Sequence, residues 1–254
     1  MTGNLIKPAS AGSLSSVSVL SSVSVLSSVP ASLSVIVPML NEQSSLPELL
    51  VHLSSLQAEY PALEIVLVDG GSEDASVSMA EAAGFRVVHS SRGRARQMNA
   101  GAQASYGECL LFLHADTRLP PQAIKHLQQA LEHGSWGRFD VSVSGSAHML
   151  RVVGFMINLR SRLSGIATGD QAMFMRRDRF EQVGCFPDQP LMEDIELSKR
   201  LRRYEHPQCL CAQVTTSGRR WMDYGVWRTI FLMWRLRWAY WRGVSAEQLA
   251  KLYI

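Results

Sequence analysis

The stretch LSVIVPML, residues 33–40, is a run of apolar and β-branched residues interrupted by one serine and one proline. This composition favours a strand that is buried on both faces of a sheet. Residues 44–57 follow with leucines at helical spacing, and the next apolar run is EIVLVD, residues 64–69. A strand, a helix and a second strand in this order predict a parallel sheet whose strands are connected by helices.

The same alternation continues along the chain. The pattern predicts a helix from Asp74 to Gly84, a strand over 86–90, a helix over 94–105, a strand over 109–116 and a further helix opened by Pro120-Pro121. Proline is common in the first turn of a helix because its fixed φ suits that position. The sequence therefore predicts an α/β fold, with a mostly parallel sheet covered by helices on both faces and one domain over residues 32–254.

The composition is that of a folded globular protein, with 254 residues, 46% hydrophobic and 19% charged. The net charge of +3 is too small for a general nucleic-acid binder, so we expect no nucleic-acid partner. The four cysteines form no CxxC pair, which fits a reduced, cytoplasmic setting. The chain has no run of 18 uninterrupted apolar residues, so no transmembrane helix is expected.

Residues 1–31 differ from the rest. They repeat a short Ser/Val unit, SLSSVSVLSSVSVLSSV, before the first convincing strand. The segment is a poor signal peptide, because it has a single lysine and serine dilutes its apolar part. We interpret residues 1–31 as a flexible, low-complexity leader outside the fold.

Polar residues follow each of the first four predicted strands. In open α/β sheets, ligands bind beyond the carboxyl ends of the strands, so these residues predict one binding site at that edge. His114 and Asp116 are two positions apart, which places them on the same face of an extended chain. The full set is Pro38, Asn41 and Glu42 after the first strand, Asp69 and Gly71 after the second, Arg94 after the third, and His114 and Asp116 after the fourth.

An ordered set of motifs resembles the inverting family-2 glycosyltransferases with the GT-A fold. The motifs are VIVPMLNE, VDGGSEDAS, RGRARQMNAGA, LHADT, GDQAMFMRR and MEDIELSKRLRR. Together with SGRRW they look most like the subgroup associated with arsenosugar biosynthesis, and the resemblance runs from Leu33 to the end of the chain. It implies transfer of a sugar, with inversion, from a nucleoside diphosphate donor such as a UDP-sugar to an unknown hydroxyl acceptor.

The resemblance also implies roles for the residues at the strand ends. Asp69 would bind the nucleobase, although it could equally be a turn carboxylate. Arg94 could equally be a surface helix residue. The other residues placed at the donor are Pro38, Asn41, Glu42, Gly71, His114, Asp116, Arg219 and Arg220.

The metal motif departs from that of the family. The usual Asp-x-Asp reads His-Ala-Asp here, and its last acid is retained as Asp116. By resemblance, Asp116 would hold Mg²⁺ or Mn²⁺ at the diphosphate, because these cations prefer one or two carboxylates plus phosphate oxygens. His114 would contact the ribose or add a nitrogen ligand.

The segment EDIEL, residues 193–197, begins an amphipathic helix with two acids at its positive end. Simple capping explains acids at this position. Two adjacent carboxylates can also have their pKa values pushed apart, which leaves one of them able to accept a proton near neutral pH. By resemblance Asp194 is the catalytic base, and Glu193 orients the acceptor.

Two further motifs have both a functional and a structural interpretation. Gly169, Asp170 and Gln171 would face the acceptor and the donor sugar by resemblance, whereas a plain turn explains Gly-Asp equally well. In SGRRW, the guanidinium groups of two arginines suit phosphate oxygens, and a tryptophan beside them would meet the sugar, although a basic helix start is an equal alternative. The residues concerned are Arg219, Arg220 and Trp221.

The tail WRTIFLMWRLRWAYWRG, residues 227–243, predicts an amphipathic helix. It could lie on the inner face of a membrane, together with the apolar segment 148–159, and serve a lipid-linked acceptor. We favour packing on the protein's own core, because such stripes are commonly buried.

Two alternative functions stay open. One is a membrane-associated transferase with a polyprenyl phosphate acceptor, and the other is a non-catalytic module that binds a nucleotide sugar. A dinucleotide-dependent oxidoreductase is disfavoured, because no GxGxxG motif follows the first strand.

Overall fold

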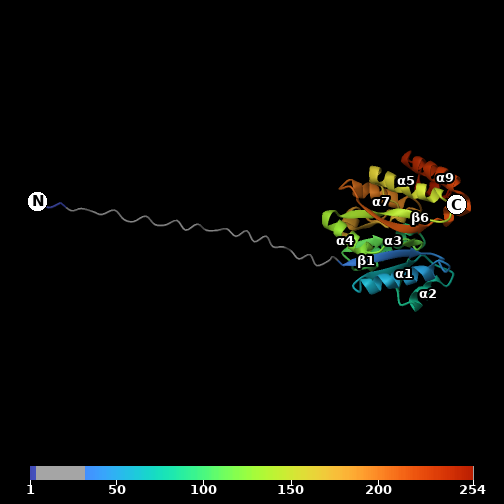
Figure 1. Cartoon of the computed structure of the whole chain (residues 1–254), viewed down its shortest axis with the longest axis horizontal. Coiled ribbons are helices and arrows are strands. Elements are labelled where there is room, and N and C mark those ends of the chain that lie inside the picture. The colour runs from blue at the N-terminus through green and yellow to red at the C-terminus, as the bar shows by residue number, and fades with distance from the viewer. Residues whose placement is uncertain (4–31, 254) are drawn as a thin grey trace.

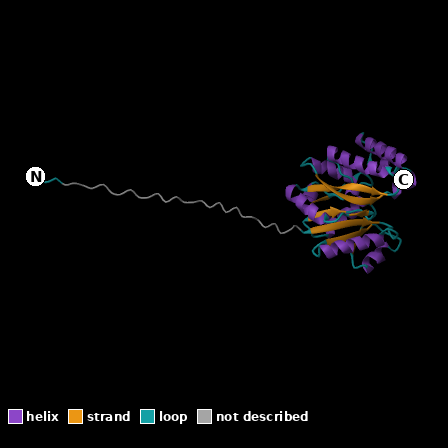
Figure 2. Ribbon diagram, in the orientation of Figure 1, coloured by secondary structure: helices purple, strands orange, loops and turns teal. Residues whose placement is uncertain are grey.

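The computed structural model describes residues 1–3 and 32–253, so most of the predicted leader over 1–31 lies outside the described residues. The described strands form a single sheet of eight strands in the order β3-β2-β1-β4-β7-β6-β8-β5. Helices cover the sheet on both faces (Figure 2). The predicted α/β fold with helices on both faces is confirmed.

The first half of the chain builds the parallel part of the sheet. β1 pairs in parallel with β2 on one side and with β4 on the other, and β2 pairs in parallel with β3. Parallel strands need crossover connections, and the helices between these strands supply them. The elements are β1 (Leu33–Met39), α1 (Leu46–Glu59), β2 (Glu64–Asp69), α2 (Ser76–Ala82), β3 (Arg86–His89), α3 (Arg94–Ala104) and β4 (Cys109–Phe112).

Close packing holds these helices on the sheet. All seven residues of β1 are buried, and the five leucines that α1 turns toward the sheet are buried as well. Each buried leucine contributes about 1.5–3 kcal/mol relative to an exposed one. On the other face, Gly101 of α3 sits directly on β1, because a Cβ at this position would lie 2.4 Å from Cγ2 of Ile36. Only glycine allows α3 to approach the sheet this closely.

The second half of the chain makes the sheet mixed. β7 runs antiparallel between β4 and β6, β8 pairs in parallel with β6, and β5 pairs antiparallel with β8. The elements are β5 (Thr117–Arg118), α4 (Ala123–His133), β6 (Trp136–Ser144), α5 (Met149–Ser164), the 3₁₀ helix η1 (Gly169–Gln171), β7 (Phe174–Arg176), α6 (Arg177–Gln182), α7 (Glu193–Arg202), β8 (Gln208–Ser217), α8 (Arg219–Tyr224), α9 (Val226–Trp241) and α10 (Ala246–Ala250).

β4 is shorter than the sequence predicts. The strand ends at Phe112, whereas the apolar run suggested that it continues to residue 116. The N–H of Leu113 still donates to the carbonyl of Ile36 (3.0 Å), but the N–H of Thr117 then donates to the carbonyl of His114 (3.0 Å), which closes a turn. His114 and Asp116 therefore leave the sheet in a turn, and the strand alternation that would put them on one face does not apply.

Buried polar contacts fasten α5 to β6. Arg138 is fully buried and forms an ion pair with Asp140, which also accepts from Nη2 of Arg162 on α5 at 2.7 Å. The side chain of Asn158 accepts from the N–H of Val141 (2.8 Å) and donates to its carbonyl (3.0 Å). Charged groups are rarely buried unless they are paired, and here the pairing fixes the position of α5.

The outer face of α9 is aromatic and exposed. Trp227, Phe231, Trp234, Trp238 and Trp241 recur along one face of the helix and are 59–76% exposed. The expectation that this tail packs on the protein's own core is wrong for these side chains. The opposite face of α9, which includes Leu236, is the one that meets the protein.

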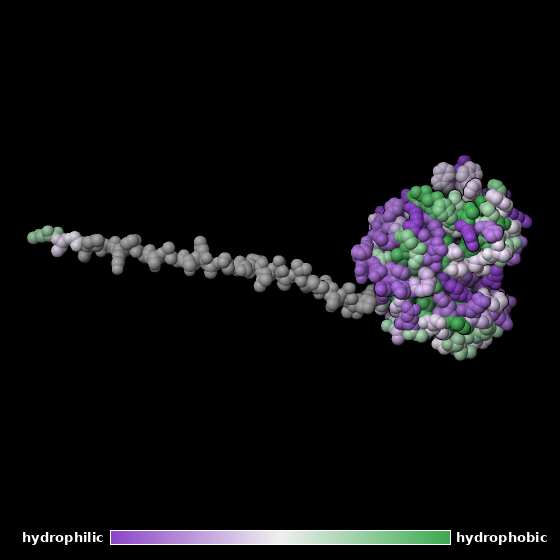
Figure 3. Space-filling view, viewed as in Figure 1, coloured by the Kyte–Doolittle hydropathy of each residue, from purple (hydrophilic) through white to green (hydrophobic). Residues whose placement is uncertain are grey.

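α5 lies beside α9 and has an apolar outer face of its own. Val226 and Ile230 of α9 pack against Leu150 and Val153 of α5, and both helices lie at the same end of the molecule (Figure 1). The exposed apolar side chains of α5 are Val152, Phe155, Met156, Leu159 and Leu163. Apolar residues appear in green over this end of the molecule in Figure 3. Within residues 32–253, no helix is both long enough and apolar enough to cross a bilayer.

Candidate active site

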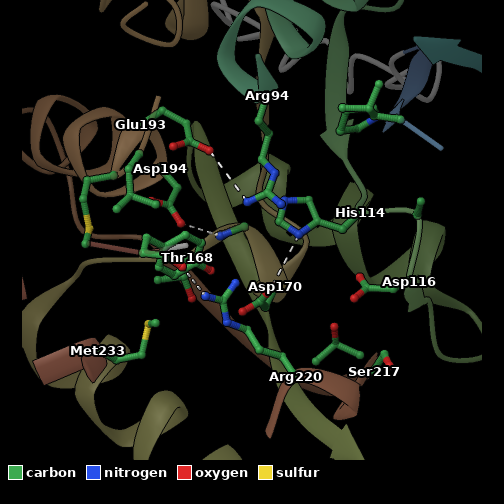
Figure 4. Close-up of a pocket in the computed structure, with 18 of the residues that line it drawn as sticks. Arg94, His114, Asp116, Thr168, Asp170, Glu193, Asp194, Ser217, Arg220 and Met233 are labelled. Atoms are coloured by element: carbon green, nitrogen blue, oxygen red, sulfur yellow. Dashed lines mark hydrogen bonds and ion pairs between the residues drawn. The ribbon is translucent and has the colours of Figure 1, made fainter. Parts of the chain in front are cut away.

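A cavity of about 720 Å³ opens at the carboxyl edge of the parallel strands. Its walls come from the ends of β1 and β4, from η1, from the start of α7 and from the inner face of α9 (Figure 4). The structure therefore brings together most of the residues that the sequence predicted. Those that line the cavity are Pro38, Glu42, Arg94, His114, Asp116, Gly169, Asp170, Glu193, Asp194, Arg219, Arg220 and Trp221.

Two of the predicted nucleotide-binding residues, Asp69 and Gly71, form a turn outside the cavity lining. Oδ2 of Asp69 accepts from the N–H of Gly71 (2.9 Å), and Oδ1 accepts from the N–H of Ser72 (3.1 Å). Burial raises the pKa of Asp69, but hydrogen bonds from Ser72 and Gly71 outweigh it and hold the pKa below its ordinary value. Gly71 has a φ of +92°, which favours glycine. Asp69 thus has the turn role that the sequence left open, and Gly71 belongs to the same turn.

Asn41 and Gln171 also lie outside the lining and organise loops. The Asn41 side chain accepts from the N–H of Glu73 at 2.8 Å, which ties the loop after β1 to the loop after β2. Gln171 is fully buried, and its side-chain oxygen accepts from the N–H of Thr168 at 3.2 Å. In this structure Gln171 shapes the η1 loop from beneath, while Gly169 and Asp170 of the same motif face the cavity.

The acid pair at the start of α7 forms one side of the cavity. Oδ2 of Asp194 accepts from the N–H of Gly169 at 2.8 Å, and Oδ1 accepts from the N–H of Ile195 at 2.7 Å. Glu193 is only 4% exposed. Burial and the adjacent Asp194 raise the pKa of Glu193, while Arg94, at 4.0 Å from Oε1, opposes the shift. A raised pKa favours the protonated form of Glu193.

The raised pKa of Glu193 makes stability depend on pH in a definite direction. Above the ordinary value of 4.5, the folded chain holds this proton more tightly than the unfolded chain. Stability is therefore lost as the pH rises toward the raised folded value. We expect Glu193→Gln to increase the melting temperature relative to wild type, by a margin that widens from pH 4 to pH 7. Thermal unfolding across this range tests it, and a constant or narrowing margin contradicts it.

Asp116 and His114 lie on the opposite side of the cavity from the acid pair (Figure 4). Asp116 is partly exposed in the cavity, and its Oδ1 accepts from Thr117 Oγ1 at 3.3 Å. No cluster of three or more potential metal-ligating side chains occurs in the described part of the chain. Mg²⁺ and Mn²⁺ sites at phosphates need only one or two carboxylates, so Asp116 suits such an ion held jointly with a diphosphate.

His114 lies against the η1 loop. Its Nδ1 lies 3.4 Å from Oδ1 of Asp170. Its Nε2 is buried without a hydrogen-bond partner and packs against Gly169, where a Cβ would approach it to 2.4 Å. In this structure His114 thus contacts the η1 loop, and its expected roles toward the ribose or a metal stay predictions.

The two arginines of the SGRRW motif differ in their surroundings. Nη2 of Arg220 donates to the carbonyl of Tyr253 at 2.9 Å, and the guanidinium stacks 3.7 Å from the centroid of the Tyr253 ring. Nε of Arg219 donates to Oγ of Ser217 at 3.2 Å and the residue is exposed. Of the two, Arg219 is the more accessible to a ligand.

Family membership follows from a sequence comparison. The profile described as "Glycosyl transferase family 2" matches residues 34–184, which is more than half of the chain. The chain belongs to glycosyl transferase family 2. The matched segment begins in β1 and extends past β7, so it contains the parallel strands, Asp116 and the η1 loop.

Bacterial transferases are similar in sequence to part of this chain. An undecaprenyl-phosphate 4-deoxy-4-formamido-L-arabinose transferase of Pseudomonas aeruginosa is 32% identical over 161 residues, covering 58% of this chain and 46% of that protein. The transferase of the same name from Klebsiella pneumoniae is 33% identical over 166 residues, covering 58% and 48%. This chain thus spans about half the length of the curated relatives it matches.

Solved structures share the fold at low sequence identity. Staphylococcus aureus TarS in complex with UDP-GlcNAc superposes with a TM-score of 0.58 at 19% identity, over 73% of this chain and 58% of that one. Glucosyl-3-phosphoglycerate synthase from Mycobacterium tuberculosis, in complex with Mn²⁺ and UDP-glucose, gives 0.52 at 19% identity, over 74% and 70%. At this identity the likeness shows the fold alone.

One wall of the cavity contains none of the residues predicted from sequence motifs. Thr229, Met233 and Arg237 of α9 line it at intervals of four residues, and Tyr253 lies beside them. The spacing in the tail was visible in the sequence, but it could not tell which side of the helix would face the site. Gln97 was also missed: its Nε2 donates to the carbonyls of Met39 (2.8 Å) and Val68 (2.9 Å), which joins the ends of β1 and β2.

Proposed function

We propose that this chain is an inverting glycosyltransferase that moves a sugar from a UDP-sugar to an acceptor, aided by Mg²⁺ or Mn²⁺. The observation that carries this proposal is the cavity itself, in which Glu193 and Asp194 lie across from Asp116. Such an arrangement separates a site for the leaving diphosphate from a site for proton removal, which direct displacement at a sugar carbon requires.

In this mechanism each side of the cavity has one task. Asp194 removes the acceptor proton, and the acceptor oxygen attacks the anomeric carbon from the face opposite the diphosphate. Glu193 orients the acceptor, and Arg219 and Arg220 lie close enough to the cavity to attract the diphosphate. A divalent ion held by Asp116 would neutralise charge on the leaving group.

The nucleotide occupies the edge formed by β1, β4 and the start of α3 in this proposal. Pro38, Glu42 and Arg94 line that edge, while Asp69, Gly71 and Asn41 shape the loops behind it. The choice of UDP as the donor nucleotide is supported by the UDP-sugars bound in the TarS and synthase structures. Trp221, Gly169 and Asp170 complete the region near the sugar.

Release of UDP tests the proposed reaction. Purified chain with Mn²⁺ and a panel of UDP-sugars should release UDP slowly by hydrolysis, and faster when a suitable acceptor is added. The anomeric configuration of the product, read by NMR, should be opposite to that of the donor. Release of UDP with retained configuration would rule out the inverting mechanism. If no donor releases UDP, the alternative of a non-catalytic binding module is favoured. The presence of both Glu193 and Asp194 in the cavity argues against that alternative.

A second candidate within the same chemistry is transfer to a polyprenyl phosphate at a membrane surface. The Pseudomonas and Klebsiella relatives are named for an undecaprenyl phosphate acceptor. The exposed aromatic face of α9 and the apolar face of α5 suit the interface of a bilayer, where tryptophan is favourable. Neither helix contains an acid, and the exposed Arg228, Arg235 and Arg242 suit anionic headgroups. An arsenic-containing acceptor is supported only by the resemblance to the arsenosugar subgroup. We therefore rank it below a lipid-linked acceptor.

Vesicle flotation tests the membrane contact. The chain should float with phosphatidylglycerol vesicles at low salt and much less with phosphatidylcholine vesicles. Trp234→Ser combined with Trp238→Ser should weaken this binding at least about tenfold, because two buried aromatic side chains contribute about 3–6 kcal/mol. Tyr106→Ser is the control, since Tyr106 is 69% exposed elsewhere on the surface. Equal flotation of the double variant and wild type would contradict this contact.

A further inference from the structure

Tyr253 lies in the lining of the cavity and holds the guanidinium group of Arg220. Nη2 of Arg220 donates to the carbonyl of Tyr253 at 2.9 Å, and Cζ of Arg220 lies 3.7 Å from the centroid of the Tyr253 ring. Both residues line the cavity, and Figure 4 shows the Arg220 side chain extending into it. Residue 253 thus contacts Arg220 twice, once through its backbone and once through its ring.

This contact differs from the other cation–π contacts among the described residues. In the other four pairs the cation lies 4.5–5.8 Å from the ring centroid. In none of those four do both partners line the cavity. Within the described part of the chain, the pair of Arg220 and Tyr253 is therefore the cation–π contact that can influence how a ligand is held in the cavity.

Packing fixes the position of Tyr253. The residue follows α10, and its N–H donates to the carbonyl of Ala250 at 3.2 Å. Its side chain packs against the apolar cluster that joins α9 and α10 to the start of α7, in which Leu236 and Leu249 are fully buried. Burial raises the pKa of the Tyr253 phenol, although Arg220 opposes the shift. The phenol is therefore neutral, and the face of its ring attracts the cation.

The two contacts leave most of the donors of Arg220 free. A guanidinium group stacks on aromatic rings through its face and binds phosphate oxygens through the N–H groups at its edge. The carbonyl of Tyr253 takes one of these donors, and Arg220 makes no other hydrogen bond to the described residues. Arg219, by contrast, is exposed and donates to Ser217. Ordering a long side chain opposes binding, and Arg220 is already ordered before a ligand arrives.

We propose that Tyr253 is a positioning residue, which holds Arg220 in the orientation that binds the diphosphate of the donor. Tyr253 acts through Arg220 and touches none of the reacting atoms. The inference rests on the proposed function, because it takes the ligand of Arg220 to be a diphosphate. The family profile ends at residue 184, so both residues lie outside the matched segment. The geometry of the pair alone supports the assignment.

The difference between UDP and uridine tests this role, because only UDP carries the diphosphate. Tyr253→Leu keeps an apolar side chain against α10 but removes the aromatic face. This variant should bind UDP with Mn²⁺ about 3–30-fold more weakly than wild type by calorimetry, which corresponds to the loss of a cation–π interaction. Its affinity for uridine, measured by NMR titration, should change by less than about twofold. Tyr253→Phe keeps the ring and the carbonyl, so it should bind UDP like wild type.

Tyr204 provides the matched control. Its ring lies 4.6 Å from Cζ of Arg179, and neither residue lines the cavity. Tyr204→Leu removes the same kind of contact at a distance from the ligand and should leave the affinities for UDP and uridine unchanged. Equal losses of UDP affinity in Tyr204→Leu and Tyr253→Leu would overturn the proposal, because the effect would then not depend on the cavity.

A double-mutant cycle distinguishes a positioning residue from a direct ligand contact. If Tyr253 acts through Arg220, Tyr253→Leu should change the UDP affinity of the Arg220→Met variant by less than about twofold. Additive losses would overturn the proposal, because Tyr253 would then have its own contact with the nucleotide. Tighter UDP binding by Tyr253→Leu would also overturn it, since Tyr253 would then compete with the diphosphate for Arg220. Parallel losses of UDP and uridine affinity would overturn it by making Tyr253 a determinant of the whole cavity.

The remaining outcomes separate this inference from the proposed function. If UDP binding depends on Arg220 and Tyr253 as described but no UDP-sugar supports transfer, the positioning role stands and the proposed function fails. If wild type transfers a sugar, and Tyr253→Leu has the same UDP affinity and the same KM for the donor, the proposed function stands and the positioning role fails. If wild type does not bind UDP with Mn²⁺, both fail.

Discussion

Asp194→Asn is expected to lower the rate of sugar transfer by about 10²–10⁴-fold, which is the usual contribution of a positioned general base. Asparagine keeps the shape of the side chain and can still accept from the N–H of Gly169, so the η1 loop should stay in place. What is lost is the ability to take a proton. UDP release with a saturating acceptor measures the effect, and UDP binding in the presence of Mn²⁺ should change by less than about threefold, since Asp194 lies on the acceptor side.

Glu196→Gln is the matched control for this variant. Glu196 lies in the same helix but outside the cavity, where Tyr240 and Arg200 contact its carboxylate. It should retain nearly full activity. Wild-type turnover in Asp194→Asn would remove Asp194 as the base, whereas equal losses in both variants would indicate a general disturbance of α7.

Asp140→Asn is expected to destabilise the fold by about 3–5 kcal/mol, because it leaves the fully buried Arg138 without a counter-charge. For a chain of this size the melting temperature should fall by about 6–20 °C. Arg162 loses its partner at the same time, and the fastening of α5 to β6 weakens. Thermal unfolding by circular dichroism measures the change.

An exposed ion pair provides the comparison for Asp140. Asp178 pairs with Arg176 at 3.3 Å, and the two side chains are 70% and 54% exposed. Asp178→Asn should therefore shift the melting temperature by less than about 4 °C, since exposed pairs contribute about 0–1 kcal/mol. Similar shifts in the two variants would show that the Arg138–Asp140 pair does not hold β6 and α5 together.

The parallel half of the fold could be predicted from the sequence because each element there carries its own signal. The apolar runs of β1 and β2 and the leucine spacing of α1 lie within a short segment, and their burial matches the predicted pattern. The mixed half could not be predicted in the same way. β7 has only three residues, and its direction depends on pairing with β4 and β6, which are distant in sequence.

The cavity could be predicted because the carboxyl ends of parallel strands lie at one edge of the sheet. The roles of single residues could not be predicted in this way. Asp69 and Gln171 carry motif signals, yet local hydrogen bonds occupy both side chains. His114 was expected beside Asp116 on one face, and the early end of β4 removed that geometry. Thr229, Met233 and Arg237 carry no motif, and their place in the cavity lining depends on how α9 packs on the rest of the protein.

Metal-dependent nucleotide binding is the most direct test of the central claim that the cavity holds a UDP-sugar through Asp116. The melting temperature should be measured with UDP, GDP, ADP and CMP, each with and without Mn²⁺, for wild type and Asp116→Ala. A ligand at about 100 times its dissociation constant raises the melting temperature by about 5–10 °C at this chain length. We predict a shift with UDP that needs Mn²⁺ and disappears in Asp116→Ala. An equal shift in the variant, or no shift with any nucleotide, would contradict the account.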